Sequence, residues 1–210
     1  MKTNESGRSM IEMLGVLAII GVLSVGGIAG YSKAMMQYKI NKTADQITQI
    51  VGNVRTLFGS QKTYAALGTG GIQTSLVKKA HLVPDEMWNA AGTALENAFG
   101  GSVAITSGRK KAENDNKAFG IVLAGIPEDA CMALATYDWG SGSSSGLISI
   151  GVNDATVYTM TTTVGCAGSS AAGKAIGCPN GATVTVPMPV NIAATACGIG
   201  DGNTISIKFY

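Results

Sequence analysis

A single acidic residue, Glu12, lies at the start of an apolar run that extends from Met13 to Ala29. As an α-helix, these 17 residues would span roughly 26 Å, which is close to the thickness of a bilayer's hydrocarbon core. A carboxylate near such a core costs roughly 2.5–3.5 kcal/mol, so it is expected to have a function or a partner. Hydrophobic patterning continues beyond the run, which a removable targeting peptide would not need. The sequence therefore predicts a membrane protein that assembles.

Beyond the apolar run, hydrophobic residues recur at alternating spacings of four and three, which is the pattern of an amphipathic helix. They are Ile40, Ala44, Ile47, Val51, Val54 and Phe58. Polar residues occupy other positions around the helix, namely Lys39, Lys42, Asp45, Gln46, Gln49 and Asn53. Gly59 and Ser60 provide a C-terminal stop. We predict one helix from Arg8 to Phe58, with an assembly stalk in its first half and the spine of a globular head in its second.

The rest of the chain predicts an antiparallel sheet with small helices, and therefore an α+β fold. Strands are expected where β-branched and apolar residues alternate between turn signals: Ser102–Ser107, Ala118–Ala124, Leu147–Val152, Ala155–Thr163 and Thr204–Tyr210. A charged hairpin is expected at Gly108–Asn116 and a Gly/Ser loop at Gly140–Gly146. Short helices are expected at Thr74–His81, Pro127–Leu134 and Val190–Ala196.

Four cysteines lie beyond the apolar run, and an even number in an exported chain indicates two disulfides. They are Cys131, Cys166, Cys178 and Cys197, and four cysteines permit three pairings. A zinc site is disfavoured, because the chain has no C-x-x-C pair and its one histidine, His81, is distant in sequence. We therefore expect disulfides and no metal.

Composition argues against several classes of function. Only 13% of the residues are charged, the formal net charge is +2, and no basic stripe favours nucleic acid as a partner. The 29 glycines, with many small residues, indicate a loop-rich and weakly hydrated surface that suits packing against copies of the same chain.

No constellation in the sequence predicts catalysis or a cofactor. Gly168–Lys174 resembles a phosphate-binding loop, but Ala175 stands where the motif needs a hydroxyl for magnesium, so we expect a solvated loop. His81 has no second histidine or evident nucleophile to act with, and its position near a helix end favours a structural role. We predict that the protein is not an enzyme.

The segment Gly7-Arg8-Ser9-Met10-Ile11-Glu12, followed directly by the apolar run, resembles the processing site of type IV prepilins. The resemblance implies that a prepilin peptidase cuts after Gly7 and that the new N-terminal residue, Arg8, is N-methylated. It also implies that Glu12, the fifth mature residue, neutralises the N-terminal amine of a neighbouring subunit. Arg8 and Glu12 lie four residues apart, so pairing within one chain is the alternative.

Segments of the head extend this resemblance to class b type IV pilins. They are Leu82–Met87, Phe99–Val103, Ile126-Pro127 before the helix that holds Cys131, and Ala196-Cys197 before the last strand. In that family a disulfide staples the C-terminal region to the sheet, which supports Cys131–Cys197. We favour this pair together with Cys166–Cys178; closing the two loops would stabilise the fold by roughly 4 and 3 kcal/mol.

The resemblance implies a leader peptide at 1–7, a hydrophobic transmembrane and assembly helix at 8–30, and a head at 31–210. It implies a structural subunit of a type IV pilus, with the other copies, the prepilin peptidase and the inner-membrane assembly machinery as partners. Such a subunit would reside in the inner membrane before assembly and in an extracellular pilus on the bacterial surface afterwards. Adhesion, aggregation, motility and transport of DNA or proteins are the roles that such filaments imply.

Three alternatives stay open at this point. A pseudopilin of a type II-like secretion system would share the architecture. A secretory signal peptide that ends at Gly27-Ile28-Ala29, with cleavage before Gly30, would instead release a soluble binding protein or adhesin. A plain membrane anchor would explain the apolar run but not the glycine before the predicted cut.

Three glycines, Gly26, Gly27 and Gly30, interrupt the middle of the predicted helix. Each costs an α-helix roughly 1 kcal/mol relative to alanine. They suit either a segment that loses helicity when subunits pack, or close contact between helices through the pair Gly26 and Gly30. We favour the first interpretation, because three glycines exceed what packing needs.

Overall fold

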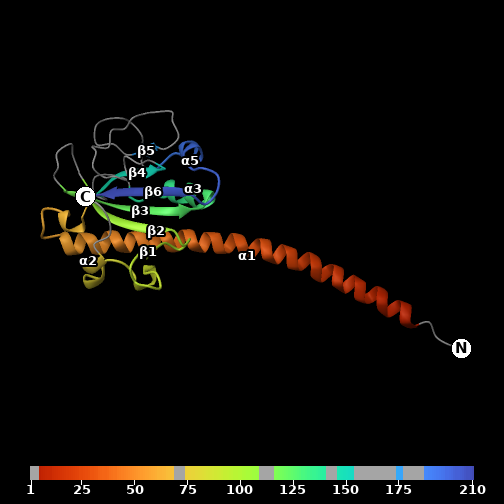
Figure 1. Ribbon diagram of the computed structural model, residues 1–210. Coiled ribbons are helices and arrows are strands. Elements are labelled where there is room, and N and C mark those ends of the chain that lie inside the picture. The colour runs from red at the N-terminus through yellow and green to blue at the C-terminus, as the bar shows by residue number, and fades with distance from the viewer. Residues whose placement is uncertain (1–4, 69–73, 109–115, 141–145, 154–173, 177–186) are drawn as a thin grey trace. The chain divides into compact units, whose positions relative to one another are not determined.

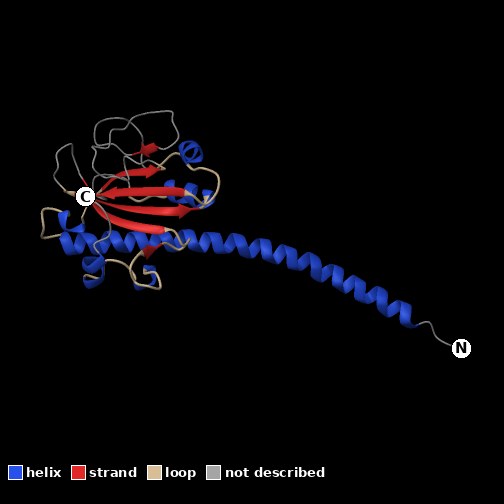
Figure 2. Ribbon diagram, viewed as in Figure 1, coloured by secondary structure: helices blue, strands red, loops and turns tan. Residues whose placement is uncertain are grey.

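The computed structural model describes residues 5–68, 74–108, 116–140, 146–153, 174–176 and 187–210. The chain divides into two units, Met1–Tyr38 and Lys39–Tyr210. The first helix, α1 (Glu5–Phe58), provides the described part of the first unit and continues into the second, which also holds a sheet and short helices (Figures 1 and 2). The predicted first helix is therefore confirmed to its last residue, and it begins before Arg8.

In the described part of the chain, six strands form one sheet in the order β1-β2-β3-β6-β4-β5, and every neighbouring pair is antiparallel. Their bounds are β1 (Leu95–Glu96), β2 (Ser102–Gly108), β3 (Ala118–Ile126), β4 (Leu147–Val152), β5 (Lys174–Ile176) and β6 (Asn203–Phe209). The C-terminal strand β6 lies between β3 and β4, as Figure 1 shows. The sheet is therefore complete only when the last residues of the chain are in place.

The three predicted short helices are present with small shifts at their ends, as α2 (Thr74–Lys79), α3 (Glu128–Ala135) and α5 (Val190–Ala196). Two further short helices, η1 (Ala65–Leu67) and η2 (Asp85–Met87), were not predicted. Pro127 caps α3 instead of beginning it, and Glu128 and Asp129 lie in its first turn, where acidic side chains interact favourably with the helix dipole.

The strand predictions agree with the structure where the structure describes them. The predicted strand at Ala155–Thr163 lies outside the described residues, as do most of the hairpin at Gly108–Asn116 and most of the loop at Gly140–Gly146. The loop predicted at Gly168–Lys174 is wrong at its last residue, because Lys174 lies in β5 opposite Val152. Strands β1 and β5 were missed because they are too short to show alternation.

One face of α1 covers one face of the sheet. All six residues of the predicted stripe are buried, with exposures of 8% or less. Apolar residues of β2, β3 and β6 line up on this face because they pair directly across the strands, as Ile105 with Ile121 and Ile121 with Ile207, whereas Val122 is buried on the opposite face. A chain of ring contacts joins the two layers, from Phe58 through Tyr64 to Phe119. This interface is the core of the head.

A second face of α1 is also buried, which the sequence analysis did not expect. Thr43, Gln46 and Ile50 are 4% exposed or less, although Gln46 had been assigned to the polar side. The Gln46 side chain donates a hydrogen bond to Glu86 Oε1 at 2.8 Å, and Lys42 Nζ lies 3.0 Å from Glu86 Oε2. Asn53 donates to the carbonyls of His81 and Leu82. The connection between α2 and β1 therefore covers this second face.

The Phe99–Val103 segment turns tightly against β3. A Cβ at Gly101 would collide with the carbonyl oxygen of Ala124, and Gly125 beside it has a φ of +66°. The buried amide of Asn97 fixes the turn, because it donates to Ala124 O and accepts from the N–H groups of Phe99 and Gly101. Only glycine allows the two backbones to approach this closely.

The C-terminal region is held by the predicted disulfide between Cys131 of α3 and Cys197 after α5. Both cysteines are buried, and a buried amide beside them adds further links. Asn203 donates to the carbonyl oxygens of Ile126, Gly198 and Gly200, and its own oxygen accepts from Gly198 N–H and the Asn153 amide. The other predicted pair, Cys166–Cys178, lies outside the described residues.

We expect Glu86→Gln to destabilise the head at neutral pH. Hydrogen bonds from Gln46 and from Lys42 lower the pKa of Glu86 below its ordinary value of 4.5. A carboxyl whose pKa is lower in the folded state stabilises the fold above its unfolded pKa, and this contribution disappears as the pH falls through the folded pKa. Because Glu86 is half exposed, the loss at pH 7 should be about 1 kcal/mol or less.

Chemical denaturation of the full chain in detergent, at pH 7 and again below the pKa of Glu86, measures this difference. The exposed neighbour Asp85 provides the matched control as Asp85→Asn. A Glu86→Gln variant with the same pH dependence of unfolding as the unaltered chain would contradict the role assigned to this carboxylate.

We expect Asn203→Ala to lower the free energy of unfolding by about 2–3 kcal/mol, because it leaves several buried backbone groups without their partner. Asn191→Ala in α5 removes the same amide from an exposed position and should change stability by less than about 0.5 kcal/mol. Denaturation curves with the disulfide intact compare the two variants. Equal losses in the free energy of unfolding would show that the buried amide of Asn203 stabilises the fold no more than the exposed amide of Asn191.

Candidate functional site

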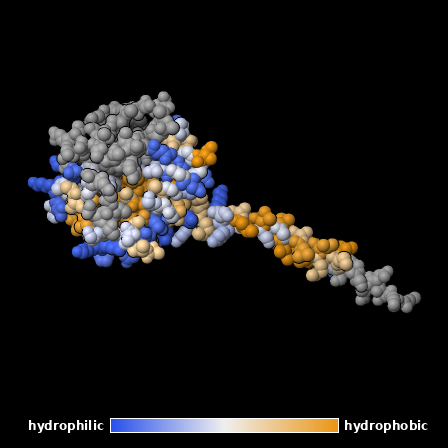
Figure 3. All heavy atoms as spheres, viewed as in Figure 1, coloured by the Kyte–Doolittle hydropathy of each residue, from blue (hydrophilic) through white to orange (hydrophobic). Residues whose placement is uncertain are grey.

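The first unit exposes an unbroken apolar surface. Between Met10 and Ile28, the large hydrophobic side chains of α1 are 52–75% exposed: Met10, Ile11, Met13, Leu14, Val16, Leu17, Ile19, Ile20, Val22, Leu23, Val25 and Ile28. Figure 3 shows the corresponding stretch of hydrophobic side chains along this part of the chain. They occur on every side of the helix, so the helix has no polar face that could lie against water. A helix of this kind requires lipid or protein around it.

Among the described helices, α1 is the one that is long and apolar enough to cross a membrane. The predicted processing site directly precedes the apolar surface, because the backbone of Gly7 and Arg8 lies in the first turns of α1 and the exposed apolar side chains begin at Met10. Glu12 lies one turn beyond Arg8, is exposed, and takes part in an interaction within the chain. The helix therefore presents this carboxylate at the N-terminal end of the apolar surface.

The glycines of the apolar segment contact nothing in the single chain. A Cβ built on Gly15, Gly21, Gly26, Gly27 or Gly30 would have no atom within 4 Å, apart from its own helix. The fold of the chain itself therefore gives no steric reason for glycine at these positions. Their use must lie in contacts with other molecules or in the lower helix stability that glycine confers.

The described part of the head contains no group of three or more side chains of the kind that hold a metal ion. His81 is exposed with a φ of +47°, and its neighbours in an open pocket of about 350 Å³ include Lys78, Asp85 and Trp88. Its backbone carbonyl accepts a hydrogen bond from the Asn53 side-chain amide, and the structural role expected of the histidine side chain stays a prediction.

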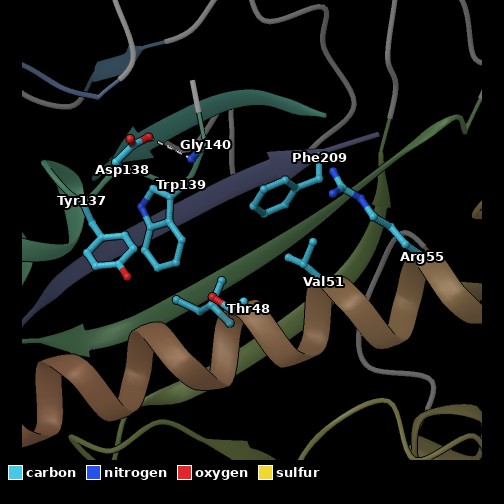
Figure 4. A pocket seen from close by; sticks show the side chains of 9 residues that line it. Thr48, Val51, Arg55, Tyr137, Asp138, Trp139, Gly140 and Phe209 are labelled. Carbon is cyan, nitrogen blue, oxygen red and sulfur yellow. Dashed lines mark hydrogen bonds between the residues drawn. The ribbon is translucent and has the colours of Figure 1, made fainter. Parts of the chain in front are cut away.

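One cavity in the head was not anticipated from the sequence. It lies between α1, β6 and the chain after α3, and aromatic residues together with Arg55 and Asp138 line it (Figure 4). The adjacent residues Tyr137, Asp138 and Trp139 form one wall. The sequence offered only one signal for this site, namely two aromatic residues around an acid immediately after a helix.

Known proteins resemble this chain both in sequence and in structure. The model of the family Bundlin matches residues 33–186. The toxin coregulated pilin of Vibrio cholerae serotype O1 (strain ATCC 39315 / El Tor Inaba N16961) is 24% identical over 135 residues. That alignment covers 64% of this chain but only 58% of the relative, so the chain spans less than two thirds of its length.

Two solved structures are similar to this one. The crystal structure of TcpA, a type IV pilin from the El Tor biotype of Vibrio cholerae, superposes with a TM-score of 0.51 at 18% identity; the match covers 82% of this chain and 99% of that one. The type IV b pilin of Salmonella typhi gives a TM-score of 0.47 at 18% identity, covering 81% and 97%.

The fold, a long N-terminal helix on an antiparallel sheet with a stapled C-terminal region, is that of a type IV pilin. Within that class, the chain belongs to the bundlin family. The resemblance inferred from the N-terminal motif and the head segments is therefore confirmed. The comparisons do not favour the pseudopilin or the secreted binding protein considered above.

We expect Gly27→Ala to increase the helicity of the chain in detergent and to reduce its assembly. No atom obstructs the added methyl group, so the helix should gain about 1 kcal/mol. Gly52→Ala in the second unit is the matched control, because it is equally unobstructed and gives the same gain away from the apolar segment. Circular dichroism measures helicity, and the yield of sheared filaments measures assembly.

If Gly27→Ala and Gly52→Ala assemble equally well, the glycines of the apolar segment have no special role. If only Gly27→Ala lowers the yield while its helicity rises, the segment needs either its flexibility or its small surface.

Proposed function

We propose that this protein is a structural subunit of a type IV pilus. Residues 1–7 form a leader that a prepilin peptidase removes after Gly7, residues 8–30 form the membrane and assembly helix, and residues 31–210 form the head. The chain resides in the inner membrane before assembly and in an extracellular filament on the bacterial surface afterwards. The main support is an apolar helix, exposed on all sides and headed by Glu12, that leads into a pilin head.

Burial of the apolar segment supplies the driving force outside the membrane. Each of its large side chains gains about 1.5–3 kcal/mol when it is fully removed from water. Extraction from lipid into water would therefore be prohibitive for a single subunit, whereas a bundle of such helices replaces lipid contacts with contacts between copies. A helical filament with these helices at its centre satisfies every subunit in the same way.

Glu12 sets the position of each subunit in this proposal. After cleavage the N-terminal amine carries a positive charge, and Glu12 carries a negative charge near the same end of the helix. In an apolar filament core, each charge alone would be costly, so pairing an amine with the carboxylate of a neighbour favours one register. The N-methyl group on Arg8 leaves that positive charge in place.

The stapled head forms the outer surface of the filament and any adhesive face. Its disulfide and amide network restrain a region whose strand β6 completes the sheet. Such restraint suits a subunit that is exposed outside the cell, where disulfides persist. The role of the chain is structural, not enzymatic.

We expect Glu12→Ala to reduce filament yield at least ten-fold, because breaking a buried ion pair costs about 3 kcal/mol or more. Negative-stain electron microscopy and the amount of pilin in the sheared fraction measure the yield, and the membrane fraction shows whether the chain is still made. Glu5→Ala, within the leader, removes the same charge from a segment absent from the filament and should have no effect.

Arg8→Ala then separates pairing between subunits from pairing within one chain. Filaments of Arg8→Ala at normal yield indicate that the amine is the partner of Glu12, whereas a loss equal to that of Glu12→Ala indicates the Arg8 side chain. Unchanged yield and subunit spacing in Glu12→Ala would contradict the proposed register.

A further inference from the structure

A cavity of about 370 Å³ opens in the head between the second half of α1, strand β6 and the chain after α3 (Figure 4). All of its lining residues belong to the unit Lys39–Tyr210. Tyr137, Asp138 and Trp139 lie at one end, and Arg55 with Phe209 lies at the other, as the close view shows. The cavity thus combines aromatic walls with one acidic and one basic group.

The acidic end carries two aromatic rings in fixed positions. The rings of Tyr137 and Trp139 are tilted by 50° with their centroids 4.7 Å apart. Trp139 is 9% exposed, and its indole N–H donates to Leu134 O at 3.0 Å, which anchors the ring. Tyr137 is 44% exposed, so one aromatic side chain remains accessible to a ligand.

Asp138 adds a negative charge beside these rings. Its Oδ1 accepts the N–H of Gly140 at 2.9 Å, which restrains the carboxylate at this end of the cavity. Aromatic faces and a carboxylate both attract a cation, and quaternary ammonium groups are recognised in this way because they have no N–H groups that need partners. This end of the cavity is therefore suited to an ammonium group.

Arg55 gives the opposite end a positive charge. Its guanidinium lies 5.4 Å from the centroid of the Phe209 ring, and Nη2 donates to Tyr210 O at 3.2 Å. These contacts hold the planar group at the cavity wall. A guanidinium has five N–H donors in a fork that matches the oxygens of phosphate or carboxylate, so the chemistry of this end of the cavity suits an acid group.

We propose that this cavity binds a small zwitterion, with a quaternary ammonium group at Tyr137, Trp139 and Asp138 and a phosphate group at Arg55. A purely anionic ligand would meet the charge of Asp138, and an apolar ligand would cover both charges without pairing them, which is unfavourable. A zwitterion carries one charge of each sign, complementary to the charged residues at the two ends. The proposal concerns the head alone and does not depend on filament assembly.

Titration calorimetry with phosphocholine, using the full chain in uncharged maltoside micelles, tests the proposal. We expect saturable binding in the millimolar range, with choline alone and inorganic phosphate each at least about ten-fold weaker. Tyr137→Leu and Asp138→Asn should each weaken binding about three- to ten-fold. Both side chains are exposed, so these variants should keep the fold, which thermal unfolding verifies.

Matched controls remove the same groups elsewhere on the chain. Tyr38→Leu and Asp201→Asn alter exposed residues that do not line the cavity and should leave binding unchanged. A water-soluble, short-chain phosphatidylcholine below its micelle concentration distinguishes the two sources of the ligand. Competition with phosphocholine indicates that the site accepts a lipid headgroup, and lack of competition indicates a free small molecule.

Absence of saturable phosphocholine binding would overturn the proposal. So would phosphate binding as tightly as phosphocholine with no effect of Asp138→Asn, which would indicate an anion site at Arg55 alone. Binding weakened about three- to ten-fold in the two cavity variants, and unchanged in the two controls, would support the site.

Discussion

The structure of the head depends on the second half of α1, which is buried on two sides. One side, from Ile40 to Phe58, covers the apolar face of the sheet, and the other, with Thr43, Gln46 and Ile50, lies under the connection between α2 and β1. The sheet also packs against α3, which contacts β4 and β6, but removing α1 would expose the connection and the face of the sheet that α1 covers. The head also depends on β6, because this C-terminal strand lies between β3 and β4 and joins the two parts of the sheet.

The same helix serves two environments because its surface chemistry changes along its length. Beyond Lys39 the helix is amphipathic and finds its partners in its own chain. Before Tyr31 it is apolar on all sides and its large side chains remain exposed. Folding buries the apolar side chains in the second half of the helix but leaves those in the first half exposed. Lipid or further copies of the chain must therefore cover them. The proposed polymerisation rests on the same physics as folding.

Periodicity in the sequence was enough to predict the second half of α1 and strand β4. The stripe from Ile40 to Phe58 and the strand Leu147–Val152 agree with the structure, since each places apolar residues at regular spacing. The family motif added the Cys131–Cys197 disulfide, which the cysteine count alone left open. The amides of Asn97 and Asn203 could not be predicted, because their partners are backbone groups that only the fold brings near, such as the carbonyl of Ile126.

The candidate sites show the same difference between features that are local in sequence and contacts that only the fold creates. Glu12 and the apolar segment could be recognised because they are contiguous in sequence, and local helix geometry determines how they are presented. The cavity at Tyr137 and Arg55 joins residues more than eighty positions apart, so nothing in the sequence connects them. Gln46 was assigned to the wrong environment because helical periodicity describes one buried face, whereas this helix has two.

The most direct test of the account is the intact mass and N-terminal sequence of the mature chain, taken from membranes and from sheared surface filaments. The account predicts a chain that begins at Arg8 and is one methyl group heavier than its sequence, present in both fractions. A soluble chain that begins at Gly30 would contradict it, because the apolar segment would then be a removed signal peptide and could not hold a filament together.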